Sequence, residues 1–165
     1  MKRYLYAHLK TDLAKKMIFI TGPRQVGKTY LAKQLMREYR SPIYLNYDNS
    51  DDAVVIRKRQ WPVSADLVVL DEVHKMKKWK TFLKGTFDTK PPHSAILVTG
   101  SARLDTFRQA GDSLAGRYFH YRLNPLTVKE ACENKSGALV VLRRLMIVMI
   151  STRNLLISTL GQETT

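Results

Sequence analysis

One short segment near the start of the chain, residues 17–29, constrains the fold more than any other. It begins with MIFIT, an apolar, β-rich run typical of a strand buried in a parallel sheet. The pattern G-x-x-x-x-G-K-T follows, and then a segment with Leu31 and Leu35 on one helical face. A strand, a glycine-rich turn and a helix in this order predict a loop whose backbone N–H groups converge on phosphate oxygens.

Each residue type in this loop has a physical reason. Glycines let the backbone curl, and the start of the following helix adds its positive dipole end to the same site. Lys28 is expected to reach the β- and γ-phosphates of ATP, and Thr29 to bind Mg²⁺. The predicted nucleotide-binding residues are Gly22, Pro23, Arg24, Gln25, Val26, Gly27, Lys28, Thr29 and Tyr30.

A second motif lies in LVVLDEVHK, residues 67–75. It consists of two acidic residues, Asp71 and Glu72, directly after the apolar run 67–70. A carboxylate at a strand end can hold the Mg²⁺ shell, and this is the role predicted for Asp71. Glu72 is then placed to orient and deprotonate a water aimed at the γ-phosphate. The alternative is an exposed acidic pair at a strand end, which is less consistent with a phosphate loop in the same chain.

The remaining chain repeats the alternation of strands and helices. Further strands are expected at 43–48, 67–71, 95–99 and 118–123, and helices from Lys28, within 49–62, after Met76 and at 103–116. This alternation predicts an α/β domain with a parallel sheet.

Other nucleotide-dependent enzymes fit the sequence less well. A GTPase would carry the guanine-binding pattern N-K-x-D, but Asn134-Lys135 has no following aspartate. A small-molecule kinase would not need Glu72 to activate a water. A DExH helicase would need a second sheet, which does not fit after residue 123, so His74 is expected only to begin a helix near the site.

Length and charge set further limits. The 165 residues suffice for one domain, and 44% hydrophobic residues can build a core. A single cysteine, Cys132, is typical of a protein in a reducing compartment. The sequence also has no recognisable signal peptide and no apolar run long enough to span a bilayer. We therefore expect a cytoplasmic protein without a membrane partner. Lys and Arg number 28 against 14 acidic residues, net +14. That excess favours polyanions as partners, and the lysines at 75–84 with Arg57–Arg59 keep nucleic-acid binding open. Such lysines are more often a solvated helix face.

Four stretches in this order resemble the prokaryotic AAA-type ATPases of the AAA_14 group: GPRQVGKT, LDEVHKMKKWKTFLKGTFD, VTGSARLD and GDSLAGRYFHYRLNPLTVKE. The resemblance covers roughly residues 1–131. It implies an AAA-like P-loop NTPase, a three-layer sandwich with a five-stranded, mainly parallel sheet. It also implies that strand 95–99 lies between strands 17–21 and 67–71, with Thr99 and Ser101 near the γ-phosphate. The alternative for Ser101 is a cap on the following helix.

The same resemblance implies an arginine acting across a subunit interface of a homo-oligomer. Arg117 directly precedes the last predicted strand and is our candidate, with a salt bridge or a solvated cation as its alternative. Arg103 could instead act within its own subunit, whereas Arg24 is expected to point away from the site. The predicted catalytic residues are therefore Glu72, Lys28, Arg117 and Ser101.

The character of the chain changes near residue 132. Residues 132–165 form an apolar and basic tail that lacks the strand–helix alternation, whereas the AAA_14 group continues into a long C-terminal region. We expect an ATPase domain at 1–131 followed by a remnant or replacement of that region. The sequence thus predicts an Mg²⁺-dependent ATPase, with two alternatives: a nucleic-acid-binding module switched by nucleotide, or an inactive fragment.

Overall fold

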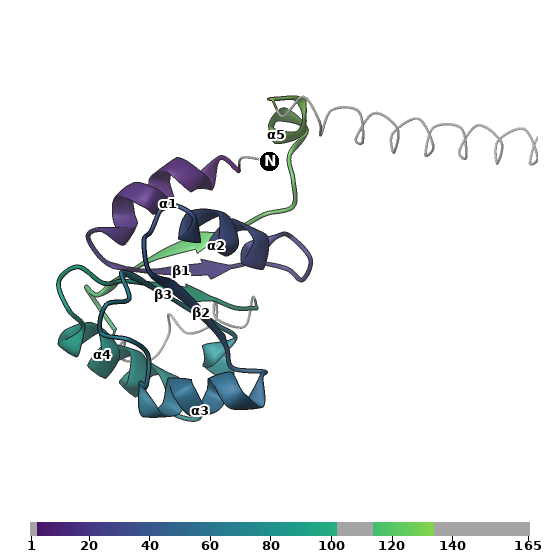
Figure 1. Ribbon diagram of the computed structural model, residues 1–165. Helices are drawn as coiled ribbons and strands as arrows, with labels where there is room; N and C mark the ends of the chain where they lie inside the picture. Colours follow the sequence, from purple (N-terminus) through teal and green to yellow (C-terminus); the bar gives the residue numbers. More distant parts are fainter. Residues whose placement is uncertain (1–2, 102–113, 134–165) are drawn as a thin grey trace, which may run out of the picture. The chain divides into compact units, whose positions relative to one another are not determined.

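The computed structural model describes residues 3–101 and 114–133 (Figure 1). The chain divides into two units. The larger unit is residues 5–125, and the smaller combines residues 1–4 with the chain from residue 126 onward.

The larger unit is built on a sheet of five strands in the order β2-β3-β4-β1-β5. All four pairings are parallel, which confirms the predicted α/β fold. β4 lies between β3 and β1, as the resemblance implied for strand 95–99. The strands are β1 (Met17–Thr21), β2 (Pro42–Asn46), β3 (Leu67–Asp71), β4 (Ala95–Thr99) and β5 (Tyr118–Arg122).

Helices cover both faces of the sheet, so the unit has three layers. Figure 1 shows α1 (Leu5–Leu13) and α2 (Lys28–Met36) on one face, and α3 (Ser50–Lys58) and α4 (Trp79–Thr89) on the other. Neighbouring residues of β1 serve opposite cores, because side chains alternate along a strand. Ile18 packs with the leucines of α1 and α2, whereas Phe19 packs with α3 and α4 residues such as Ile56 and Trp79.

Strand sequences and burial correspond closely. β1, β3 and β4 are buried at every residue, and these are the continuous apolar runs of the sequence. β2 and β5 are edge strands and only partly buried. β2 begins at Pro42, a residue without an N–H to donate, which suits an edge strand. The predicted strands 43–48 and 118–123 therefore occur at slightly different bounds.

The structure contains two helices that the sequence analysis did not predict, α1 and a short 3-10 helix before α4. α1 was missed, although Leu5, Leu9 and Leu13 recur at helical spacing and are all buried. The helix expected after Met76 is preceded by a short 3-10 helix, η1 (Val73–Lys75), so His74 does lie at a helix start. No described helix is long and apolar enough to cross a membrane.

The smaller unit contains α5 (Val128–Glu133) and a buried ion pair. Arg3 Nε donates to Glu130 Oε1 at 3.0 Å, and the backbone N–H of Tyr4 donates to the same oxygen. The N–H and hydroxyl of Thr127 donate to the other carboxylate oxygen. The predicted helix at 103–116, with Arg103, falls mostly outside the described residues, as does the predicted tail beyond Glu133.

Candidate functional site

The site begins in the loop between β1 and α2, residues 22–27. Gln25 and Gly27 both have positive φ values, 64° and 93°, so the loop curls tightly before α2. Gly27 occupies the cap position, and it supplies no side-chain hydrogen bond to the first N–H groups of α2. The amino-terminal donors of a helix need partners, and an anion at this position would provide them.

Gly22 fits its position because there is no room for a side chain. A Cβ at this residue would lie 2.3 Å from the backbone oxygen of Leu123, and φ is 148°. The adjacent N–H of Leu123 donates to Thr21 O at 2.7 Å, which fixes the end of β5 against the start of the loop. The loop is therefore anchored by the edge strand as well as by β1.

Lys28 lies over the loop that precedes it. Its Nζ donates to the backbone oxygens of Gly22 at 3.0 Å and Pro23 at 2.8 Å. Burial lowers the pKa of Lys28, while the carboxylates of Glu72 and Asp71 act to raise it. The ammonium group is thus close to the phosphate loop and within the field of both predicted acidic residues.

Asp71 is the most highly connected acidic residue of the site. It is buried at the end of β3. Thr29 and Tyr44 donate to its Oδ2 at 3.2 and 2.5 Å, and Thr99 donates to Oδ1 at 2.5 Å. Burial and the bond to Asp71 raise the pKa of Tyr44. The carboxylate is therefore held by hydroxyls from α2, β2 and β4.

Glu72 is held by backbone and by cations. Its φ of 55° is left-handed, and its N–H donates to Thr99 O at 3.0 Å. Its Oε2 lies 3.6 Å from both His74 Nε2 and Lys75 Nζ. Lys75 is bound in turn by both carboxylate oxygens of Asp48, which raises the pKa of Lys75.

Ser101 contacts a neighbour of the predicted water activator. Its hydroxyl lies 3.2 Å from His74 Nε2, the same nitrogen that faces Glu72. The structure thus brings together Lys28, Thr29, Asp71, Glu72, Thr99 and Ser101 at the carboxyl edge of the sheet. Sequence reasoning missed Tyr44 and the pair Lys75–Asp48, although the position of 43–48 as a strand indicates that its end belongs to this edge.

The remaining loop residues lie around this cluster. Pro23, Arg24 and Gln25 are exposed, Val26 is half-buried, and Tyr30 is 52% exposed at the start of α2. Besides burial, the charge of Arg24 lowers the pKa of Lys28, so the two cations are within electrostatic range of each other, and the orientation expected for Arg24 stays a prediction.

Arg117 lies elsewhere in the unit. It precedes β5, whose first residue is the register partner of Met17, so it is at the amino edge of the sheet. Its Nε and Nη2 donate to the two oxygens of Asp88 on α4 at 2.7 and 3.2 Å, and this pairing lowers the pKa of Asp88. The structure therefore does not bring Arg117 to Lys28 and Glu72 within one subunit.

The donors present at the carboxyl edge fit Mg²⁺ and a nucleotide. Within residues 3–101 and 114–133 no group of three His, Cys, Asp or Glu side chains forms a metal cage. Mg²⁺ in nucleotide sites uses one or two carboxylates with phosphate and water, which matches Thr29 beside Asp71. The glycine loop would supply backbone donors for the phosphates.

Comparison with known proteins identifies the family. A family of AAA domains, AAA_14, matches residues 14–132. The chain belongs to this family. It is also 29% identical over 116 residues to an uncharacterized protein of Mycobacterium tuberculosis and to one of Mycobacterium bovis. The match covers 69% of this chain but 26% of each relative, so this AAA-domain chain spans about a quarter of the length of the curated relatives that it matches.

Proposed function

We propose that this AAA domain binds Mg²⁺-ATP in the loop 22–29 and hydrolyses the bond between the β- and γ-phosphates. The observation that carries the proposal is the convergence of the loop, Lys28 and the Asp71 hydroxyl cluster at one edge of the sheet. Parallel α/β sheets bind ligands at the carboxyl ends of their strands. The family assignment supports an ATPase-like domain at the same residues.

The residues divide the chemistry between them. The backbone N–H groups of the loop and Lys28 Nζ would bind the phosphates, for which Lys28 must exchange the carbonyls of Gly22 and Pro23 for phosphate oxygens. Thr29 and Asp71 would hold Mg²⁺, directly or through water. The ion supplies positive charge against the charge that develops on the phosphates.

Glu72 is the proposed general base. Its carboxylate would accept the proton of a water directed at the γ-phosphate, while His74 and Lys75, each 3.6 Å from Oε2, restrain the carboxylate. Ser101 acts through His74 in this proposal, as a positioning residue for Glu72.

Two substitutions test this function. Lys28→Ala should abolish measurable Mg²⁺-ATP binding in isothermal titration, since the cation is lost from the cradle. Glu72→Gln keeps the shape of the side chain, so ATP should bind with unchanged affinity while steady-state hydrolysis falls by about 10²-fold or more. Equal ATP affinity in Lys28→Ala and the native chain would reject the phosphate site. ATP binding without turnover in the native chain would reject the hydrolase and leave a nucleotide-binding module.

A further inference from the structure

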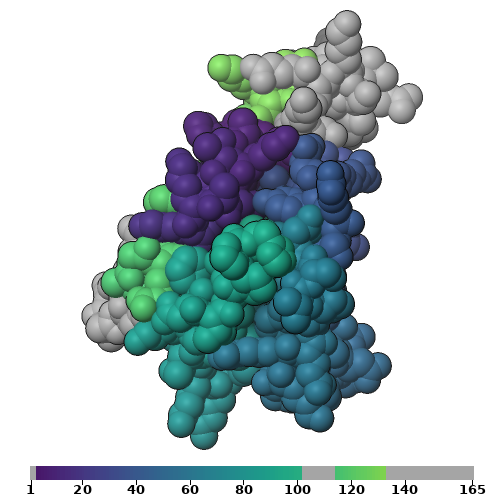
Figure 2. Space-filling model, turned by 60° about the vertical axis from the view of Figure 1, so that its left-hand side comes forward, coloured from purple at the N-terminus to yellow at the C-terminus, as the bar shows by residue number. Residues whose placement is uncertain are grey.

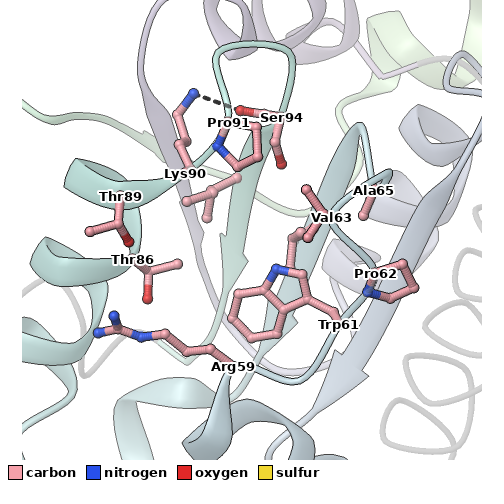
Figure 3. A pocket seen from close by; sticks show the side chains of 12 residues that line it. Arg59, Trp61, Pro62, Val63, Ala65, Thr86, Thr89, Lys90, Pro91 and Ser94 are labelled. Carbon is pink, nitrogen blue, oxygen red and sulfur yellow. Dashed lines mark hydrogen bonds between the residues drawn. The ribbon is translucent and has the colours of Figure 1, made fainter.

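A cavity lies at the edge of the sheet opposite to the proposed nucleotide site. The cavity of about 160 Å³ is lined by Val68 and Ile96, the second residues of β3 and β4, so it opens at the amino ends of these strands. Figure 3 shows Thr86 and Thr89 of α4 along one side and Trp61 and Val63 along the other. The nucleotide site is at the carboxyl ends of the same strands, so the two sites are separate.

Two cations flank this cavity, and both are held in place. Arg59 Nη2 donates to Phe82 O at 3.1 Å, and its guanidinium lies over the Phe82 ring. Gly85 makes room for it, because a Cβ there would be 2.7 Å from Nη2. On the other side Lys90 Nζ donates to Ser94 O at 2.6 Å, as drawn in Figure 3.

Within the part of the chain that the structure describes, neither cation has an acidic partner. The described residues that line the cavity include no Asp or Glu, and Arg59 and Lys90 donate their hydrogen bonds to neutral backbone carbonyls. Burial also lowers the pKa of Lys90, and no carboxylate counteracts it. A partly buried ammonium without a counter-ion is stabilised by an incoming anion.

The size and lining of the cavity identify what can enter it. Cofactor-sized ligands fill pockets of about 300–1,000 Å³, whereas 160 Å³ suits one apolar side chain. The hydroxyls of Thr86 and Thr89 donate to carbonyls of their own helix, each at 2.8 Å. They therefore do not supply donors for the edge of a nucleobase, which would be left with unmatched polar groups. Val63 is 77% exposed and extends the apolar wall outward.

We propose that this cavity binds an extended segment of a partner protein, with one apolar side chain in the cavity and carboxylates over Arg59 and Lys90. In an extended chain, residues two positions apart lie on the same face. The segment therefore carries its acidic residues two positions before and two positions after the apolar one. This spacing puts both carboxylates on the side that faces the protein.

The binding test uses the full chain and Trp61 fluorescence. Trp79→Phe leaves Trp61 as the single tryptophan, since the chain has two. The probe is a capped peptide, Gly-Asp-Ser-Leu-Ser-Asp-Gly, and it should cause a saturable change in fluorescence. Replacing both Asp by Asn should weaken binding about tenfold, and replacing Leu by Ser should abolish it. Equal affinities of the Asp peptide and the Asn peptide would overturn the proposal, as would the lack of a saturable change in fluorescence.

Variants of Val63, which is exposed, limit any effect on folding, and Lys90→Met replaces a partly buried side chain by one of similar length. Val63→Asp should weaken peptide binding about tenfold, whereas Val63→Lys should leave it equal or tighter, and Lys90→Met should weaken it at least about threefold. ATP affinity should stay unchanged in all three, which separates this site from the proposed nucleotide site. Equal losses in both Val63 variants would reject the charge complementarity. Tighter binding of an oligothymidylate would indicate a nucleic-acid surface, and equally tight binding of 4-methylpentanoate a small-molecule site; either overturns the proposal.

Discussion

The hydroxyl of Thr99 donates a hydrogen bond to Asp71 Oδ1 at 2.5 Å, and these residues are register partners on the neighbouring strands β4 and β3. Both are buried, Thr99 completely. Thr29 and Tyr44 donate to the other carboxylate oxygen. The Asp71 carboxylate therefore links the centre of the sheet to the helix that follows the phosphate loop, and a change in it alters hydrogen bonds in both.

Thr99→Val should destabilise the fold by about 1–3 kcal/mol, because it leaves a buried carboxylate oxygen without its donor while preserving shape. Thr99→Ser retains the hydroxyl and is the matched control, with a smaller loss from the missing methyl group. Urea unfolding measures both. We also expect weaker Mg²⁺-ATP binding in Thr99→Val than in Thr99→Ser. Identical unfolding curves for the two variants would show that the hydroxyl contributes nothing.

Gly22→Ala should be far more damaging than Gly116→Ala. Both glycines have positive φ, 148° and 78°, but a Cβ at Gly22 meets Leu123 O whereas one at Gly116 meets nothing within 4 Å. Gly116→Ala should therefore cost only the conformational strain, roughly 1–2 kcal/mol. Gly22→Ala adds a backbone clash, for a total of about 2–5 kcal/mol, and should weaken ATP binding. Thermal unfolding and isothermal titration measure these effects, and equal costs would contradict the tight approach of β5 to the loop.

The sequence predicted the central sheet well because buried parallel strands need continuous apolar runs. LVVLD and AILVT are such runs, and their observed bounds equal the predicted ones. The predicted ends of β2 and β5 differ from the observed ones by one or two residues, because edge strands are only partly buried and their sequences mix polar and apolar residues. α1 was not predicted, because a short helix with only Leu5, Leu9 and Leu13 on its buried face gives a weak periodic signal.

The site was predictable only where a motif carries its own chemistry. Lys28, Asp71 and Glu72 follow from local patterns at strand and helix ends. The contacts of Tyr44 with Asp71 and of Ser101 with His74 join residues 27 positions apart in each case. They depend on which strands are neighbours and in which register, and no local pattern encodes that. A salt bridge was the alternative predicted for Arg117, but its partner Asp88 was unpredictable for the same reason.

The ion pair in the smaller unit should give a pH dependence at acidic pH. Although burial alone would raise it, backbone N–H groups of Thr127 and Tyr4 and the Arg3 guanidinium lower the pKa of Glu130 to about 2, from 4.5. The stabilisation is therefore complete above pH 4.5 and is lost as the pH falls through about 2. Hydrogen exchange of the Tyr4 amide, which bonds to Glu130, should be protected at pH 5 and lose protection towards pH 2. Glu130→Gln should lack this transition, and a transition retained in that variant would assign it to another group.

The last prediction separates two roles of Arg117. In the structure it binds Asp88 at the amino edge of the sheet, so any action on the γ-phosphate has to come from a neighbouring subunit. An arginine delivered in this way can contribute about 10³-fold or more to the rate.

Arg117→Ala and Asp88→Ala both remove the ion pair, but only the first removes the arginine. If Arg117 acts in trans, Arg117→Ala should lose about 10³-fold in turnover with unchanged ATP binding, while Asp88→Ala should keep the native rate or exceed it. Turnover per subunit should also rise with protein concentration. Mixing Arg117→Ala with Glu72→Gln should recover activity, because one mixed interface pairs an intact Glu72 with an intact Arg117. Equal losses in Arg117→Ala and Asp88→Ala, with no recovery on mixing, would instead assign Arg117 to the salt bridge alone.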